Sequence, residues 1–148
     1  MKKKNRIRPL AICVFRKDDR ILVAEGFDPV KEQVFYRPLG GGIKFGERSE
    51  DTIRRELMEE INAKVGELFY LETLENIFTF NGDPGHEIVM IYDGVLIDSG
   101  LYDQAVIEGN EAEMGETFAA VWKSLTDFES GKSILYPDGL TALLRRHS

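Results

Sequence analysis

An α/β domain with a mixed sheet is the fold that this sequence predicts. Apolar, β-rich segments lie before and after one well-marked helical segment, and a second helical segment closes the chain. The 148 residues are enough for one domain with a buried core, and we interpret residues 1–148 as a single domain. No internal repeat and no linker rich in proline, glycine or serine divides the sequence.

Short strands are expected before the helix. Residues 10–15 are apolar and β-rich, residues 17–20 form a polar turn, and residues 21–24 return as a second strand, which together predict a hairpin. Residues 33–36 predict a further strand, which Pro38 and the glycines after it are expected to end.

The helical pattern is strongest at residues 49–61. Ser49 is expected to cap this helix, and Glu50 and Asp51 suit the positive end of its dipole. An apolar stripe recurs every four residues at Ile53, Leu57 and Ile61.

Strands are expected again after the helix. Residues 69–80 and 87–97 predict two strands, and residues 81–85 between them form a dense turn signal. Residues 117–122 predict another strand, and residues 138–146 a closing helix.

Composition excludes several classes of function. The net charge of −7 argues against a nucleic acid polymer bound on a basic face, and no apolar run approaches the roughly 18 residues that a membrane span needs. The single cysteine, Cys13, excludes a disulfide framework and fits a cytoplasmic location. Cys13 is expected to be a small core residue.

Three carboxylates gather on the central helix. At 100° per residue, Glu56, Glu59 and Glu60 fall within an arc of roughly 100° at the edge of the buried face. An oxygen-rich cluster of this kind suits a hard cation such as Mg²⁺ or Mn²⁺. The alternative is a solvated acidic face that binds nothing.

The neighbours of the cluster favour a site. Gly40, Gly41 and Gly42 allow a tight turn and a close approach of the backbone to a ligand. Arg55 lies beside the glutamates and can orient one of them, and Glu47 is a natural partner for this arginine.

This segment resembles the Nudix box, G-x5-E-x7-R-E-U-x-E-E-x-G-U, where U is a bulky aliphatic residue. Gly41 matches the first glycine, Glu47 the lone glutamate, and residues 55–60 the R-E-U-x-E-E core. Six fixed identities at roughly 6% each would match by chance on the order of once in 10⁵ chains of this length. Asn62 replaces the last glycine and Ala63 the last aliphatic residue, and asparagine tolerates the left-handed conformation expected there.

The resemblance implies a Nudix fold, an α/β/α sandwich with a mixed sheet. It also implies a hydrolase that cleaves a phosphoanhydride bond of a nucleoside diphosphate linked to another moiety, with Mg²⁺ or Mn²⁺. The substrate would be a small nucleotide-type molecule. Many relatives dimerise, which favours a homodimer.

Residue roles follow from the same resemblance. Metal ligands are expected at Glu56, Glu59, Glu60 and the carbonyl of Gly40, with Arg55 and Glu47 as an orienting pair. Relatives often supply one more glutamate from a later loop as ligand or base. The candidates here are Glu111, Glu113 and Glu116, of which Glu116 is favoured. Which glutamate acts as the base stays open.

The substrate also stays open. The proline that marks many ADP-ribose enzymes and the tyrosine that marks many dinucleoside polyphosphate enzymes are absent, because Phe78, Thr79 and Phe80 occupy those regions. A non-standard nucleotide is one alternative. A second function class is a catalytically silent Nudix-fold module that binds nucleotides or regulates, although such modules often lose the glutamates that this chain keeps. For Arg37, contact with a phosphate and a surface ion pair are both open.

Overall fold

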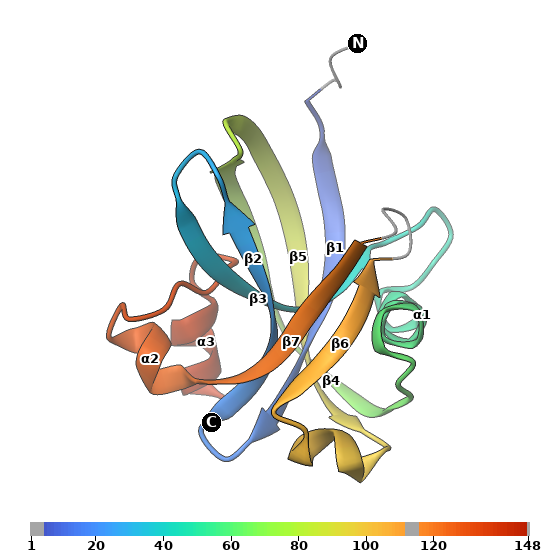
Figure 1. Ribbon diagram of the computed structural model, residues 1–148. Coiled ribbons are helices and arrows are strands. Elements are labelled where there is room, and N and C mark those ends of the chain that lie inside the picture. Colours follow the sequence, from blue (N-terminus) through green and yellow to red (C-terminus); the bar gives the residue numbers. More distant parts are fainter. Residues whose placement is uncertain (1–4, 112–115, 148) are drawn as a thin grey trace.

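A seven-stranded mixed sheet forms the centre of the molecule (Figure 1). The computed structural model describes residues 5–111 and 116–147. The strands follow the order β4-β5-β1-β3-β2-β7-β6. Their bounds are β1 Ile7–Lys17, β2 Arg20–Asp28, β3 Gln33–Gly42, β4 Val65–Phe80, β5 Asp83–Leu96, β6 Val106–Glu111 and β7 Glu116–Ser124. β1 and β5 pair in parallel, and β1 pairs with β3 in the antiparallel sense, which makes the sheet mixed.

Helices lie on both sides of the strands. In Figure 1, α1 (Ser49–Ile61) lies on one side, and α2 (Leu125–Glu129) and α3 (Leu140–Arg146) lie on the other. A short 3-10 helix, η1, spans Ser99–Asp103. This arrangement confirms the predicted α/β/α sandwich with a mixed sheet. Among the described residues, no helix is both long and apolar enough to cross a membrane.

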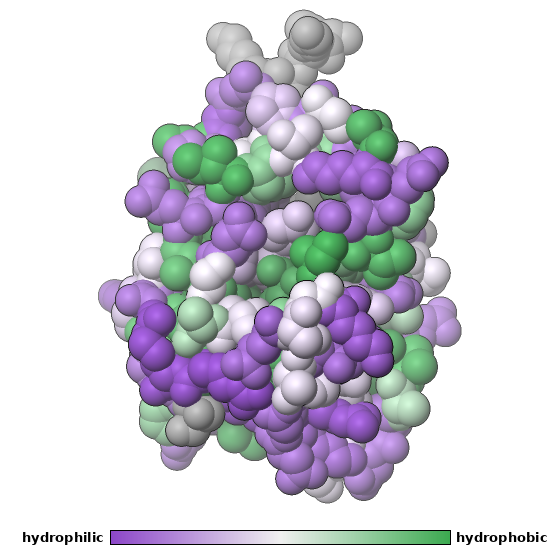
Figure 2. All heavy atoms as spheres, turned by 90° about the vertical axis from the view of Figure 1, so that its left-hand side faces the viewer, coloured by the Kyte–Doolittle hydropathy of each residue, from purple (hydrophilic) through white to green (hydrophobic). Residues whose placement is uncertain are grey.

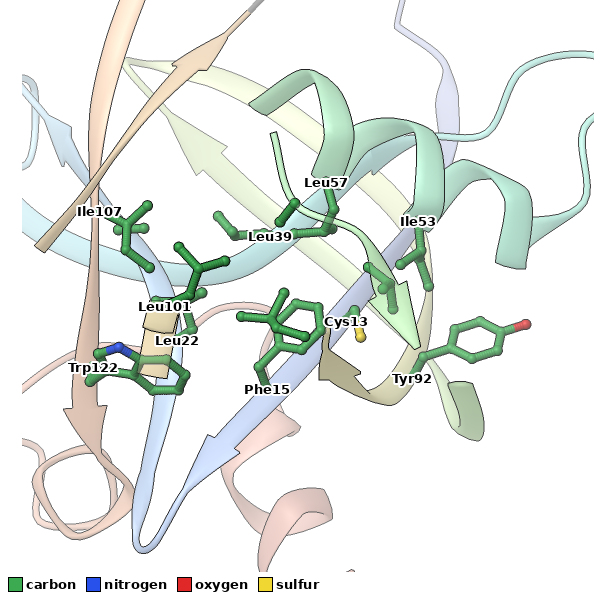
Figure 3. Packing of buried hydrophobic residues seen from close by; sticks show 14 of the residues in the cluster. Cys13, Phe15, Leu22, Leu39, Ile53, Leu57, Tyr92, Leu101, Ile107 and Trp122 are labelled. Carbon is green, nitrogen blue, oxygen red and sulfur yellow. The ribbon is translucent and has the colours of Figure 1, made fainter. Parts of the chain in front are cut away.

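Two apolar clusters hold these layers together. In the first, Ile53 and Leu57 of α1 are fully buried and point toward Leu39 and Cys13 (Figure 3). In the second, Leu140, Leu143 and Leu144 of α3 pack against the opposite side of the sheet. Burial of each such side chain contributes roughly 1.5–3 kcal/mol. The stripe predicted for α1 is therefore the surface that fixes the helix on the sheet.

Cys13 is a core residue, as predicted, and Trp122 is also buried in the core. Cys13 is fully buried, and this burial raises the pKa of its thiol. The Trp122 ring stacks on Tyr102 with 5.3 Å between the ring centroids. Neither residue is placed to take part in surface chemistry.

The prediction that Pro38 and the glycines end the third strand is wrong. β3 continues to Gly42, because it changes partner within its length. Gln33–Pro38 pairs with β2, and the next residues, Leu39 to Gly42, pair with β1. Pro38 is the last residue paired with β2, where a missing N–H interrupts least.

The expected cap of α1 is also wrong. Arg48 is the N-cap residue and makes no side-chain capping bond. The Ser49 hydroxyl instead lies 2.6 Å from the Tyr92 hydroxyl on β5. Glu50 and Asp51 do lie in the first turn, as predicted. Sequence patterns also missed β6 and α2.

The surface that carries the β2–β3 hairpin and helices α2 and α3 is mixed in character. Figure 2 shows hydrophobic atoms as separate patches among hydrophilic ones on this face. The apolar side chains exposed on the β2–β3 hairpin are Phe27, Val30 and Val34.

Candidate active site

Two adjacent glycines at the end of β3 bring the strand close to its neighbours. Gly40 has φ +149°, and a Cβ there would lie 2.2 Å from the carbonyl oxygen of Ala11. A Cβ on Gly41 would lie 2.5 Å from the carboxyl carbon of Glu56. Gly40 therefore allows backbone contact with β1, and Gly41 leaves room for a carboxylate of α1.

Arg55 connects the strand, the loop and the helix. Its Nε and Nη2 donate to the two Glu47 oxygens at 2.8 and 2.9 Å, so the ion pair expected from the sequence is present. Its Nη1 donates to Glu56 Oε1 at 2.8 Å and to Glu59 Oε2 at 3.4 Å. Nη2 also donates to the Gly42 carbonyl at 3.1 Å. One guanidinium therefore sets the spacing of three glutamates.

Glu47 is held as a carboxylate. Besides Arg55, it accepts hydrogen bonds from the Thr52 hydroxyl at 2.6 Å and from the Lys44 N–H at 3.2 Å. The Arg55 and Thr52 bonds lower the pKa of Glu47 to about 2. Glu47 stays ionised at neutral pH and serves to orient Arg55.

Glu60 differs from Glu47, because burial and nearby negative charges raise its pKa instead of lowering it. It is 6% exposed, and its Oε1 has no hydrogen-bond partner among the described residues. Burial, followed by the charges of Glu56 and Glu111, raises the pKa of Glu60 to about 8, although the Gly40 N–H and Arg37 oppose the shift. A buried carboxylate with one unpartnered oxygen is unfavourable in isolation, which points to a positive ligand.

Glu56 and Glu59 differ in burial. Burial raises the pKa of Glu56, and Arg55 partly opposes this shift. The Glu59 side chain is 40% exposed and makes the longer contact to Arg55. The three glutamates of the helix thus grade from buried to exposed across one face.

The later glutamates fall at the β6–β7 hairpin. Glu111 and Glu116 face each other as strand partners. The charge of Glu111 raises the pKa of both Glu56 and Glu60, so Glu111 lies near the helix cluster. Glu116 is exposed. Glu113 lies outside the described residues.

The donor set suits a hard divalent cation, although the side chains do not yet converge. Among the described residues, no three acidic, histidine or cysteine side chains are arranged to hold a metal ion. Arg55 takes the positive position between Glu56 and Glu59. To reach a cation shared with Glu60, Glu59 would give up its 3.4 Å contact with Arg55, and Glu60 offers a buried oxygen that has no partner among the described residues.

The end of the Nudix box keeps the expected backbone conformation, although two of its residues differ from the pattern. Asn62 is the C-cap residue of α1 with φ 52° and ψ 41°, the left-handed conformation predicted for it. Its N–H satisfies a helix carbonyl, as a glycine at this position would. Ala63 is buried in the first apolar cluster. The two departures from the pattern therefore leave the helix end intact.

The sequence profile described as "NUDIX domain" matches residues 5–138. The chain belongs to the Nudix family. Membership identifies it as a Nudix hydrolase, an enzyme of the class that acts on phosphoanhydride bonds, as the box predicted.

Solved structures of other hydrolases share the fold. A Nudix hydrolase from Nitrosomonas europaea superposes with a TM-score of 0.65 at 13% identity, over 96% of this chain and 88% of that chain. A MutT Nudix hydrolase from Burkholderia pseudomallei gives 0.61 at 19% identity, over 94% and 95%. A protein described as an ADP compounds hydrolase gives 0.61 at 19% identity, over 95% and 72%. At these identities the likeness establishes the Nudix fold.

Sequence reasoning missed two polar residues near the site. Thr52 is fully buried, and its hydroxyl donates a hydrogen bond to Glu47. The sequence feature that could have revealed it is a polar residue on the apolar face of α1. Glu87 on β5 is also buried and lies 3.9 Å from Arg37. The residues around Glu87 in the sequence do not indicate this position, because it depends on the pairing of β5 with β1.

Proposed function

We propose that this Nudix hydrolase uses Mg²⁺ or Mn²⁺ to cleave a phosphoanhydride bond in a nucleoside diphosphate linked to another moiety. The observation that supports this most is the buried Glu60 carboxylate, which has an unpartnered oxygen beside Glu56. The arrangement disfavours the ionised form of Glu60 unless a positive ligand is bound.

Glu56, Glu59, Glu60 and the Gly40 carbonyl are the proposed cation ligands. When bound, a divalent cation neutralises charge on the phosphate oxygens and lowers the pKa of an attacking water. Arg55 sets the positions of Glu56 and Glu59, and Glu47 fixes the orientation of Arg55. The buried part of the cluster keeps bulk water from Glu60.

We propose one further glutamate from the β6–β7 hairpin. Glu116 is the candidate from the sequence, and the influence of Glu111 on Glu56 and Glu60 supports Glu111 instead. The matched pair Glu111→Gln and Glu116→Gln decides between them. We expect Glu111→Gln to lower kcat by about 10²-fold and Glu116→Gln to lower it less than about threefold. The reverse order would assign the role to Glu116.

A catalytically silent nucleotide-binding module is the alternative. The complete R-E-U-x-E-E core and the Arg55 contacts support catalysis over this alternative. The small-molecule substrate is proposed as nucleotide-type. The buried, unpaired Cys13 supports a cytoplasmic location.

The test is phosphate release from a panel of nucleoside triphosphates, nucleotide sugars, dinucleoside polyphosphates and ADP-ribose, with Mg²⁺ and with Mn²⁺. One structural relative is described as an ADP compounds hydrolase, which justifies the ADP-containing members of the panel. We expect metal-dependent turnover that Glu59→Gln removes. No turnover with any compound, together with a nucleotide-induced shift in melting temperature, would establish the silent module.

A further inference from the structure

Arg8, Arg37 and Glu87 form a charged cluster outside the box. Glu87 on β5 is the strand partner of Arg8 on β1. Its Oε2 lies 3.7 Å from Arg8 Nη1, and its Oε1 lies 3.9 Å from Arg37 Nη2. The three residues come from three strands, so only the folded sheet brings them together.

The cluster holds its two positive groups loosely. The Glu87 side chain is 4% exposed, whereas Arg8 is 52% and Arg37 41% exposed. Both ion-pair contacts exceed hydrogen-bond distance. Within residues 5–111 and 116–147, neither guanidinium donates a hydrogen bond to the protein. Their N–H groups therefore remain available to a ligand.

The cluster adjoins the glycine strand that carries the candidate active site. Arg8 Nη2 lies 3.8 Å from the point that a Cβ on Gly42 would occupy. The carbonyl of the same Gly42 accepts a hydrogen bond from Arg55.

Charge explains why a substrate would need this cluster. The chain has a net charge of −7, and the helix glutamates repel a phosphate that no cation shields. Two guanidinium groups and one carboxylate leave one net positive charge beside that helix. Guanidinium groups also match phosphate oxygens in geometry, which a point charge does not.

We propose that Arg8 and Arg37, drawn together by Glu87, form an anion subsite that binds a phosphate group of the nucleotide substrate. The identity of the anion as a phosphate rests on the proposed function. The acidic helix would hold the cation, and the two guanidinium groups would bind other phosphate oxygens of the same substrate. Both contacts then fix the phosphate chain across the glycine strand.

The first experiment measures binding without metal. Inorganic triphosphate is titrated calorimetrically in EDTA into wild type, Arg8→Gln, Arg37→Gln and the double variant. Arg20→Gln is the matched control, because this exposed arginine starts β2 beside the hairpin turn at the other end of β1. We expect each single variant to weaken binding about 3–10-fold and the double variant about 10–100-fold, with the control within about twofold.

Thermal melts show whether each variant is folded. Both arginine side chains are substantially exposed and donate no hydrogen bond to the described residues, so we expect melting temperatures close to wild type. Higher salt should weaken triphosphate binding to wild type more than to the double variant. Equal affinity for wild type and the double variant would overturn the subsite, as would no wild-type binding up to about 10 mM.

Glu59→Gln separates the subsite from the hydrolase proposal. This variant should lose metal-dependent turnover and keep metal-free triphosphate binding. Arginine-dependent triphosphate binding without turnover in wild type would refute hydrolysis and leave the subsite intact. Turnover in wild type with arginine-independent triphosphate binding would refute the subsite and leave the hydrolase intact.

Discussion

Glu60→Gln should stabilise the metal-free protein in a pH-dependent way. The Glu60 pKa rises from 4.5 to about 8 on folding, chiefly because the carboxyl is buried. Well below pH 4.5, the folded and the unfolded states both hold the Glu60 proton. Between these pKa values the folded state holds a proton that the unfolded state has released, so stability falls as pH rises. Above about pH 8 the whole penalty is present, and glutamine avoids it.

The magnitude follows from the width of this window. Each pKa unit corresponds to about 1.4 kcal/mol. From pH 5.5 to pH 8.5, wild type should lose about 3 kcal/mol through Glu60 alone. Groups distant from Glu60 titrate alike in both proteins, so the difference between variant and wild type reports the titration of Glu60 and of the carboxylates coupled to it.

Urea denaturation in EDTA at pH 5.5 and pH 8.5 measures the effect. The unfolding free energy of Glu60→Gln, relative to wild type, should be about 3 kcal/mol more favourable at the higher pH. Adding Mg²⁺ at pH 8.5 should stabilise wild type more than the variant, because the cation removes the penalty that glutamine never had. A difference that is the same at both pH values would refute the raised pKa assigned to the buried Glu60.

The adjacent glycines should give opposite phenotypes. Gly40→Ala places a Cβ against the Ala11 backbone, so we expect a loss of about 3 kcal/mol or more in urea unfolding, and a near-wild-type midpoint would contradict this. The atoms nearest to a Cβ on Gly41 are the movable carboxyl end of Glu56, so in Gly41→Ala kcat should fall about 10²-fold while stability changes by less than about 1 kcal/mol. Arg55→Lys keeps the charge but loses the paired bonds to Glu47, so kcat should fall about 10–100-fold; unchanged kcat would show that charge alone suffices.

The fold and the box were predictable because their signals are local. The bounds of α1, its buried Ile53 and Leu57, and the Glu47–Arg55 pair all depend on spacing within about 15 residues. The left-handed Asn62 followed from the conformational preference of one residue. Each of these features can be predicted from residues that are close together in the sequence.

The parts that the sequence missed depend on distant partners. Ser49 does not cap α1, because its hydroxyl forms a hydrogen bond with the Tyr92 hydroxyl of β5 instead. β6 carries Gly109 and acidic residues, which weaken a strand pattern, and its pairing with β7 decides its conformation. The Arg8–Glu87 contact requires the parallel register of β1 on β5, which no local pattern encodes.

The change of partner within β3 also restricts the length of the chain. Pro38 is in register with Val23 on β2, and Leu39, the next residue, is in register with Cys13 on β1. An inserted or deleted residue here would shift Gly40 by one position and turn every later side chain to the opposite face. Evolution and engineering must therefore preserve the residue count between Arg37 and the glycines that follow it.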